Sequence, residues 1–292
     1  MIAYYPGCSA AGSAADYEKS LRAVCAILDI SFTDLPDWNC CGSTPAHALS
    51  TELSTALCVR NLDIASRMSA EAVATSCPSC LSNLRLARQR MGNAEFRDRV
   101  NGLLDEPAAE NLPQTYSVLQ IIHEIFSDAE ILSHRVLKPL EGIRVAPYYG
   151  CLLSRPSTLM ADFGSAENPR AMEDLLGACG ADVLEFPLKT DCCGAAFGIP
   201  ERRVTATLSA KILDAATGMG ADCIAVACPL CQMNLDLRQR QAAKEAGRDF
   251  DIPVVYFSQL MGLAFGCKPR ELGLEKLAVS AAPLVRKLKG RA

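Results

Sequence analysis

Short apolar runs of strand length alternate along the chain with longer segments whose apolar residues recur at helical spacing. In the first half, the runs IAYY, SFTDL and AVATSC mark three such strands. The segment after IAYY carries one apolar helical face, at Tyr17, Leu21, Val24 and Leu28. The segment after SFTDL carries another, at Leu53, Leu57, Ile64 and Met68. Strands that alternate with helices predict an α/β fold.

The second half of the chain repeats this alternation. The runs RVAPYYG, ADVLEF and CIAVAC take the places of the three strands, and a helical segment runs through Val204, Leu208 and Ile212. A fourth strand–helix unit follows in each half, as TYSVLQIIHEIF and VVYFSQLMGLAF. We therefore predict two tandem, pseudo-symmetric halves, each a small parallel sheet flanked by helices.

The boundary between the halves is predicted near residues 140–142, which gives a first domain over 1–140 and a second over 141–292. The first domain includes a polar, proline-punctuated segment, 92–114, which predicts a surface excursion. From Lys268 onward, seven basic residues stand against two acidic ones. This tail is either a docking surface or a solvated end of the chain.

Composition bounds the class of protein. Half of the 292 residues are hydrophobic and 21% are charged, a balance that supports a packed core and argues against disorder. The net charge of −4 gives no broad basic surface for nucleic acid. The chain has neither an apolar run long enough for a membrane span nor the start of a signal peptide. We therefore expect a cytoplasmic protein.

Cysteine departs from ordinary usage, with 15 residues in the chain. Without an export signal, such a count indicates metal or redox chemistry rather than disulfide stapling. Ten of the cysteines form two matching sets. The first, in YPGC, CCG and CPSC, is Cys8, Cys40, Cys41, Cys77 and Cys80; the second, in YYGC, CCG and CPLC, is Cys151, Cys192, Cys193, Cys228 and Cys231. The same motifs in the same order indicate an internal duplication, with the cysteines at the carboxyl ends of the strands.

Each set offers more thiols than a structural zinc site uses. Thiolates are soft ligands for zinc, copper(I) and iron–sulfur clusters, and structural zinc is satisfied by four ligands. Two adjacent cysteines reach two irons of one cluster more easily than a single metal ion. Five sulfurs with an adjacent pair therefore favour a polynuclear cluster. The CPSC and CPLC motifs would lie at helix N-termini, where the helix dipole stabilises thiolates.

The doubled pattern resembles the CCG domain found in the B subunit of heterodisulfide reductase, and the resemblance extends over nearly the whole chain. YYPGCSAAG near the start, PDWNCCG, and FSQLMGLAFG followed by ELGLEK near the end agree with this resemblance. Related modules occur in glycolate- and lactate-oxidising complexes and in thiol:fumarate reductases. Because the chain has neither a ferredoxin-type CxxCxxC run nor a GxGxxG flavin fingerprint, it resembles the stand-alone subunit.

The resemblance implies two noncubane 4Fe-4S clusters, each held by all five cysteines of one set. It also implies an oxidoreductase that reduces or forms a disulfide bound between the two clusters. We predict that the cleft for this substrate lies between the halves, near the CCG turns. Breaking a disulfide takes two electrons, whereas an iron–sulfur cluster usually passes one at a time, which gives the duplication a chemical reason. The implied partners are two further proteins of a heterodisulfide reductase-like complex, its ferredoxin-like C subunit, which exchanges electrons directly, and its flavin-containing A subunit. Gly42 and Gly194 would allow tight turns beside the metal.

Two other classes of function remain open. One is a metal-free dithiol oxidoreductase that works through CPSC and CPLC. The other is a non-catalytic subunit of a larger dehydrogenase complex, either an electron relay or a zinc-stapled scaffold.

Several residues outside the two sets have alternative interpretations. His47 would either protonate a leaving thiolate, or lie at the surface or behind the residues that hold the metal. Lys189 would either steer an anionic substrate or be solvated. The remaining cysteines are predicted to be structural core residues: Cys25, Cys58, Cys179, Cys223 and Cys267.

Overall fold

Two four-stranded parallel sheets form the framework of the protein. The computed structural model describes residues 1–126, 129–160 and 165–290. The first sheet has the order β2-β1-β3-β4, and the second has the equivalent order β6-β5-β7-β8. The strands are β1 (Ile2–Tyr5), β2 (Thr33–Asp34), β3 (Ala72–Thr75), β4 (Gln114–Ser117), β5 (Arg144–Tyr148), β6 (Asp182–Val183), β7 (Cys223–Val226) and β8 (Val254–Tyr256). The predicted fold class, two halves with one small parallel sheet each, is confirmed.

Helices cover both sheets. In the first half they are α1 (Gly7–Ala10), α2 (Ala15–Ile27), α3 (Ser43–Leu49), α4 (Thr51–Arg67), α5 (Pro78–Arg90), α6 (Ala94–Asn101), α7 (Val118–Ile125) and α8 (Ala129–Ser133). In the second half they are α9 (Ala171–Ala178), α10 (Arg202–Gly218), α11 (Pro229–Leu237), α12 (Gln239–Ala246), α13 (Phe257–Ala264) and α14 (Ala282–Lys289), with short 3-10 turns η2 (Ala195–Phe197), η3 (Pro269–Leu272) and η4 (Leu274–Lys276). No helix of the described residues is long and apolar enough to cross a bilayer.

The position of α4 in the chain agrees with the prediction, and its predicted face is partly right. Ile64 and Met68 pack against the core, whereas Leu53 is 40% exposed. The residues of α4 that are buried in the core are Cys58, Val59, Leu62 and Ala65. Apolar residues occur on two sides of this helix, so their spacing alone could not select the side that faces the sheet. The segment 92–114 also contains a helix that the sequence did not predict, α6, whose Val100 is buried.

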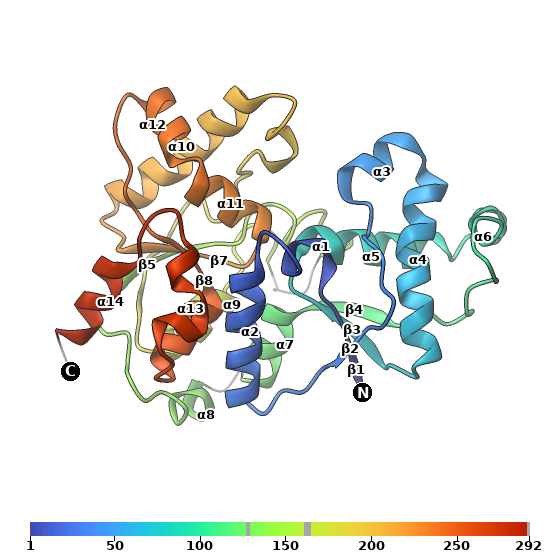
Figure 1. Ribbon diagram of the computed structural model, residues 1–292, viewed down its shortest axis with the longest axis horizontal. Helices are drawn as coiled ribbons and strands as arrows, with labels where there is room; N and C mark the ends of the chain where they lie inside the picture. The colour runs from blue at the N-terminus through green and yellow to red at the C-terminus, as the bar shows by residue number, and fades with distance from the viewer. Residues whose placement is uncertain (127–128, 161–164, 291–292) are drawn as a thin grey trace.

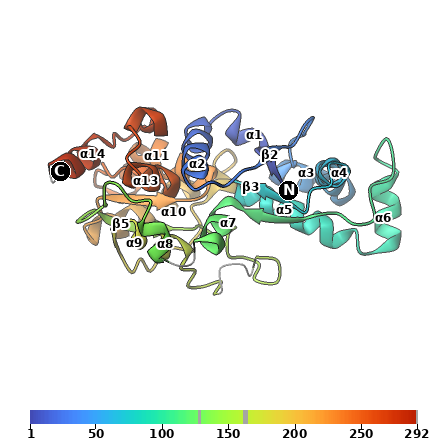
Figure 2. The same ribbon diagram turned by 90° about the horizontal axis from the view of Figure 1, so that it is seen from below.

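One hydrophobic core crosses the predicted boundary between the halves. It joins Tyr17 and Val118 of the first half with Tyr148 and Tyr256 of the second. Figures 1 and 2 both show α2 beside α13, between the helices that form the two ends of the molecule. At this contact, the Ser20 and Ser258 hydroxyls lie 2.7 Å apart. The far side of the first sheet has a core of its own, around Tyr5, Leu62 and Leu84. Whether 1–140 and 141–292 are separate domains stays a prediction.

Candidate metal centres

The first cysteine set gathers at the carboxyl end of the first sheet. Cys8 lies in α1, just after β1, and Cys40 and Cys41 lie in the loop between β2 and α3. Cys77 is the N-cap residue of α5, and Cys80 lies in its first turn. Because the strands are parallel, their carboxyl ends meet at one edge and bring these residues together from separate parts of the chain.

The sulfur atoms of this first set lie in close pairs. Cys41 Sγ is 3.5 Å from Cys80 Sγ, and Cys40 Sγ is 3.9 Å from Cys8 Sγ. Cys41, Cys77 and Cys80 are buried, whereas Cys8 and Cys40 are exposed. The set therefore has a buried end inside the protein and an open end at the surface.

The second set has the same arrangement on the second sheet. Cys151 follows β5, Cys192 and Cys193 precede η2, Cys228 is the N-cap residue of α11, and Cys231 lies in its first turn. Cys193 Sγ is 3.6 Å from Cys231 Sγ. Cys192 is exposed, as Cys40 is in the first set, and Cys193 is buried, as Cys41 is. The structure thus brings together the cysteines of each predicted set.

Two pairs of glycines shape the motifs. Gly42 and Gly194, after the adjacent cysteines, have φ of 78° and 79°, so the predicted tight turns are confirmed. Sequence reasoning missed the other pair, Gly7 and Gly150, which stand before the first cysteine of each set. A Cβ at Gly150 would lie 2.8 Å from Cys231 Sγ, and one at Gly7 would lie 3.1 Å from Cys80 Sγ. The repeated letters GC in YPGC and YYGC were the available signal.

Two asparagines that the sequence reasoning missed donate hydrogen bonds to the buried sulfurs. Asn83 Nδ2 lies 3.6 Å from Cys41 Sγ, and Asn234 Nδ2 lies 3.6 Å from Cys193 Sγ. Each asparagine comes three residues after the last cysteine of its set, so CPSCLSN and CPLCQMN carried a signal. His47 Nε2 lies 2.9 Å from Asn83 Oδ1, which connects the histidine with Cys41 through the amide.

The thiols of each set hold their protons unequally. The hydrogen bond between Cys41 and Cys80 is the largest of the causes that lower the pKa of Cys41 to about 6, whereas the same interaction raises the pKa of Cys80 well above its usual value. The hydrogen bond from Cys151 likewise lowers the pKa of Cys192 to about 6. Burial raises the pKa of Cys40 to about 11. Neighbouring thiolates repel one another, so complete ionisation of a set needs a bound cation.

This contrast predicts different reactivity for Cys40 and Cys192 in the metal-free protein. At about pH 7.5, the thiolate fraction of Cys192 is on the order of a thousandfold larger than that of Cys40. A thiolate of low pKa is a weaker nucleophile, so Cys192 keeps roughly a tenfold advantage in its rate of reaction. We expect iodoacetamide to label Cys192 about tenfold faster than Cys40. Mass spectrometry of the labelled peptides measures both rates. Equal rates across the pH range would contradict the assigned difference in pKa.

Both interpretations of Lys189 are wrong. Its side chain and that of Glu173 are each 7% exposed, and Lys189 Nζ donates to Glu173 Oε1 at 2.5 Å and to Pro169 O at 2.7 Å. The Lys189 backbone oxygen accepts from the amides of Tyr149 and Gly150. Lys189 therefore ties α9 to the strand end that precedes Cys151. Lys189 meets Glu173 only in the folded chain, because the two residues are not neighbours in the sequence.

The cysteines outside the two sets are mainly core residues, as predicted. Cys25, Cys58, Cys179 and Cys223 are buried, and Cys267 is half-buried. None of the 15 cysteines, which all lie in the described residues, is in a disulfide bond. Cys58 Sγ also lies 3.4 Å from the backbone oxygen of Cys41, which it helps to hold.

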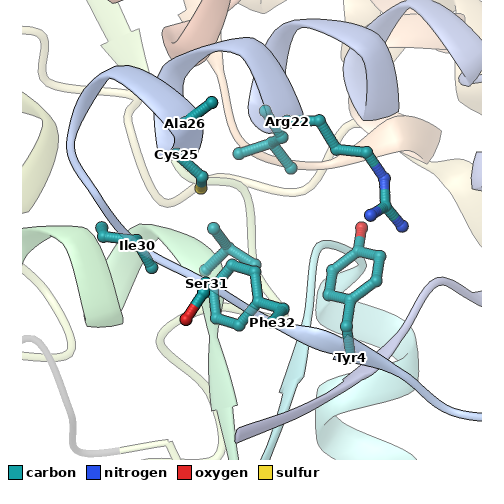
Figure 3. Close-up of a pocket in the computed structure, with 9 residues that line it drawn as sticks. Tyr4, Arg22, Cys25, Ala26, Ile30, Ser31 and Phe32 are labelled. Carbon is teal, nitrogen blue, oxygen red and sulfur yellow. The ribbon is translucent and has the colours of Figure 1, made fainter.

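Two cavities bear on where a small molecule could reach the cysteine sets. One, of about 240 Å³, lies in the first half, where Figure 3 shows the Cys25 sulfur facing the segment of Ile30 and Phe32. No motif cysteine lines it. The other, of about 540 Å³, is lined by Cys151 and Arg155 among other residues, and it is open to solvent. It borders the second set alone, so the predicted cleft between the two CCG turns stays a prediction.

The donor atoms fit an iron–sulfur cluster in their chemistry. Within the described residues, no three His, Cys, Asp or Glu side chains converge on the position of one metal ion. Instead, each set offers five soft sulfur donors, with an amide N–H directed at a buried sulfur. In the second set, the Gly194 amide also donates to Cys192 Sγ at 3.3 Å. Hydrogen bonds of this kind to sulfur accompany iron–sulfur ligation in proteins.

Comparisons with known proteins agree with this chemistry. The model of the CCG cysteine-rich domain matches residues 2–85 and 145–236, which contain all ten motif cysteines. The chain is 32% identical to the 8-methylmenaquinol:fumarate reductase membrane anchor subunit of Wolinella succinogenes, over 97% of this chain and 98% of the relative. It is 31% identical to the B subunit of the ferredoxin:CoB-CoM heterodisulfide reductase of Methanosarcina mazei, over 98% and 96%.

A solved structure has the same fold. The crystal structure of a hypothetical protein from Helicobacter pylori superposes with a TM-score of 0.75 over 96% of this chain, at 15% identity. The chain spans 52% of that structure's length. At this identity the likeness concerns the fold alone.

Proposed function

The chain belongs to the CCG cysteine-rich domain family, and from that premise we propose that it is the catalytic iron–sulfur subunit of a heterodisulfide reductase-like complex. One observation carries the proposal: two equivalent sheets each gather five thiols at the carboxyl ends of their strands. The similarity to the B subunit of a heterodisulfide reductase, over nearly the whole length of both chains, supports it.

The ten motif cysteines would hold two noncubane 4Fe-4S clusters, one in each set. When bound, the clusters supply the electrons, one at a time. A disulfide takes up two electrons and two protons as its S–S bond breaks, and it leaves as two thiols. We place this substrate between the two sets, with Asn83 and Asn234 holding buried ligand sulfurs on either side. The reverse reaction would form the disulfide and return two electrons.

Partner subunits must exchange those electrons. A ferredoxin-like C subunit would be the immediate electron partner, with a flavin-containing A subunit behind it, in a cytoplasmic complex. The exposed cysteines at the open end of each set, Cys40 and Cys192, mark the side where a substrate or partner can approach.

A second candidate function is an electron relay in a larger reductase. The similarity to the Wolinella succinogenes subunit, which is named as a membrane anchor of a fumarate reductase, favours this alternative. A relay would contain clusters but would not turn over a disulfide. A zinc-stapled subunit would contain no clusters.

Metal analysis of anaerobically purified protein tests the proposal. We expect about eight irons and eight acid-labile sulfides per chain, as two 4Fe-4S clusters require, with visible absorption. The same sample, given a reduced dye and a panel of thiol disulfides, should release two thiols for each disulfide consumed. Clusters without disulfide turnover would indicate the relay. Stoichiometric zinc, or activity without metal, would overturn the iron–sulfur assignment.

A further inference from the structure

The register of the two sheets identifies an equivalent position beside each cysteine set. In the first sheet, Ser117 at the end of β4 pairs with Thr75, two residues before Cys77. In the second sheet, Tyr256 at the end of β8 pairs with Val226, two residues before Cys228. The duplicated fold therefore puts a serine at one position and a tyrosine at the other.

The two side chains use their hydroxyls differently. Ser117 Oγ accepts a hydrogen bond from the Gln120 amide at 3.0 Å, so it caps α7. Tyr256 is fully buried, and its hydroxyl has no hydrogen-bond partner among the residues that the structure describes. A buried hydroxyl without a partner destabilises the fold, because it loses the hydrogen bonds that it makes in water. A retained donor of this kind needs an acceptor that the protein chain itself does not provide.

Tyr256 is held rigidly at the contact between the halves. Its ring stacks on that of Tyr17 in α2, with centroids 3.9 Å apart and planes within 2°. The Tyr17 hydroxyl donates to the backbone oxygen of Ala227, which directly precedes Cys228, at 3.5 Å. The Tyr256 amide is fixed in turn, because it donates to Gln259 Oε1 at 2.9 Å. The stack thus packs against the strand end that carries the second set.

Electrostatics place the cysteines near both rings. Burial raises the pKa of Tyr256 well above its usual value, and negative charge on Asp16, Tyr17, Cys228 and Cys231 raises it further. Burial is also the largest cause that raises the pKa of Tyr17, followed by charge on residues that include Cys228 and Cys77. The stack therefore lies within electrostatic range of both cysteine sets. The acceptors within electrostatic range of Tyr256 are thus the carboxylate of Asp16, which already accepts from Gln259 Nε2 at 3.5 Å, and the sulfurs of Cys228 and Cys231.

We propose that the Tyr256 hydroxyl donates a hydrogen bond to a sulfur of the second set when its cluster is bound, and that this donor raises the reduction potential of the second cluster above that of the first. The inference rests on the proposed function and deepens it. A hydrogen bond to sulfur stabilises the reduced, more negative cluster. The Ser117 hydroxyl sits on a single side-chain carbon and is held at the N-cap of α7, so it lacks the reach of a tyrosine hydroxyl and the first set has no equivalent donor at this position. Tyr256 is thus a positioning residue that makes the two clusters unequal.

Tyr256→Phe tests the proposal, because it removes one oxygen and keeps the ring stack. Redox titration followed by electron paramagnetic resonance measures both clusters of the intact protein. We expect iron content and folding to stay unchanged, and one cluster to shift to a lower potential. A tenfold change in its ratio of oxidised to reduced forms corresponds to about 59 mV for one electron. The other cluster should keep its potential.

Tyr17→Phe is the matched control. It removes a buried hydroxyl from the same stack, but one that already donates to a backbone oxygen. We expect both potentials to stay within the error of the titration. An equal shift in Tyr17→Phe would assign the effect to packing of the stack and overturn the proposal.

Cluster content and reduction potential together distinguish a failure of the Tyr256 hydrogen bond from a failure of the proposed function. If the unaltered protein contains two clusters and Tyr256→Phe shifts neither, the hydrogen bond is disproved while the iron–sulfur assignment stands. If the unaltered protein contains no clusters, both fall together. Should Tyr256→Phe not fold, the unaltered protein exchanged into D2O provides the test. The asparagine amides supply exchangeable deuterons at both clusters, so one cluster must then show one more coupled deuteron than the other, and equal numbers at both would overturn the proposal.

Discussion

Replacement of Cys193 by serine is expected to remove or reshape the second cluster and to leave the first intact. Iron and sulfide should fall from about eight to about four per chain if the cluster is lost. Cys193 Sγ lies 3.6 Å from Cys231 Sγ and accepts from the Asn234 amide, at the buried end of its set. A serine oxygen is a harder donor with a shorter reach, so it cannot replace this sulfur at an iron. Metal analysis and electron paramagnetic resonance measure the loss.

The duplication provides the reciprocal variant and the control. Cys41→Ser should affect the first cluster in the same way, because Cys41 occupies the equivalent place beside Cys80. Cys179→Ala, which changes a buried cysteine outside both sets, should keep the iron content. If Cys41→Ser or Cys193→Ser retained two native clusters and full activity, the five-cysteine assignment would be wrong.

Replacement of Lys189 by methionine is expected to lower the free energy of unfolding by about 3–5 kcal/mol, the usual cost of breaking a buried ion pair on one side. The change leaves the Glu173 carboxylate buried without its cationic partner. Glu173 also accepts a hydrogen bond from the Tyr149 hydroxyl at 2.6 Å, so the damage reaches the segment before Cys151. Chemical unfolding, followed by circular dichroism under anaerobic conditions, measures the change.

An exposed pair beside the same motif is the control. Lys211 Nζ lies 3.0 Å from Asp191, and these side chains are 61% and 39% exposed. Lys211→Met should therefore change stability by no more than about 1 kcal/mol. Adding Glu173→Gln to Lys189→Met should restore part of the loss, since the buried charge is then removed. Similar small effects of Lys189→Met and Lys211→Met would show that the buried pair contributes little.

Local patterns in the sequence were sufficient for the architecture. Strand-length apolar runs and helical spacing predicted the alternation, because backbone geometry ties these periods to one element each. The repeated motifs predicted the two halves and grouped the ten cysteines, because parallel strands bring their carboxyl ends to one edge. The glycines after the adjacent cysteines also follow from local geometry, since Gly42 and Gly194 adopt a left-handed backbone.

Contacts between residues that are far apart in the sequence could not be predicted from these local patterns. The side of α4 that faces the sheet depends on the neighbours it meets, and Lys189 is buried because the fold brings Glu173 to it. Asn83 and Asn234 gain their role only when a helix N-terminus meets the CCG loop. The sequence by itself therefore determined the elements, their order and the two cysteine sets. Tertiary structure decided which side chains lie beside the sets, above all the Tyr17–Tyr256 stack next to the second set, because burial and charge depend on contacts across the whole chain.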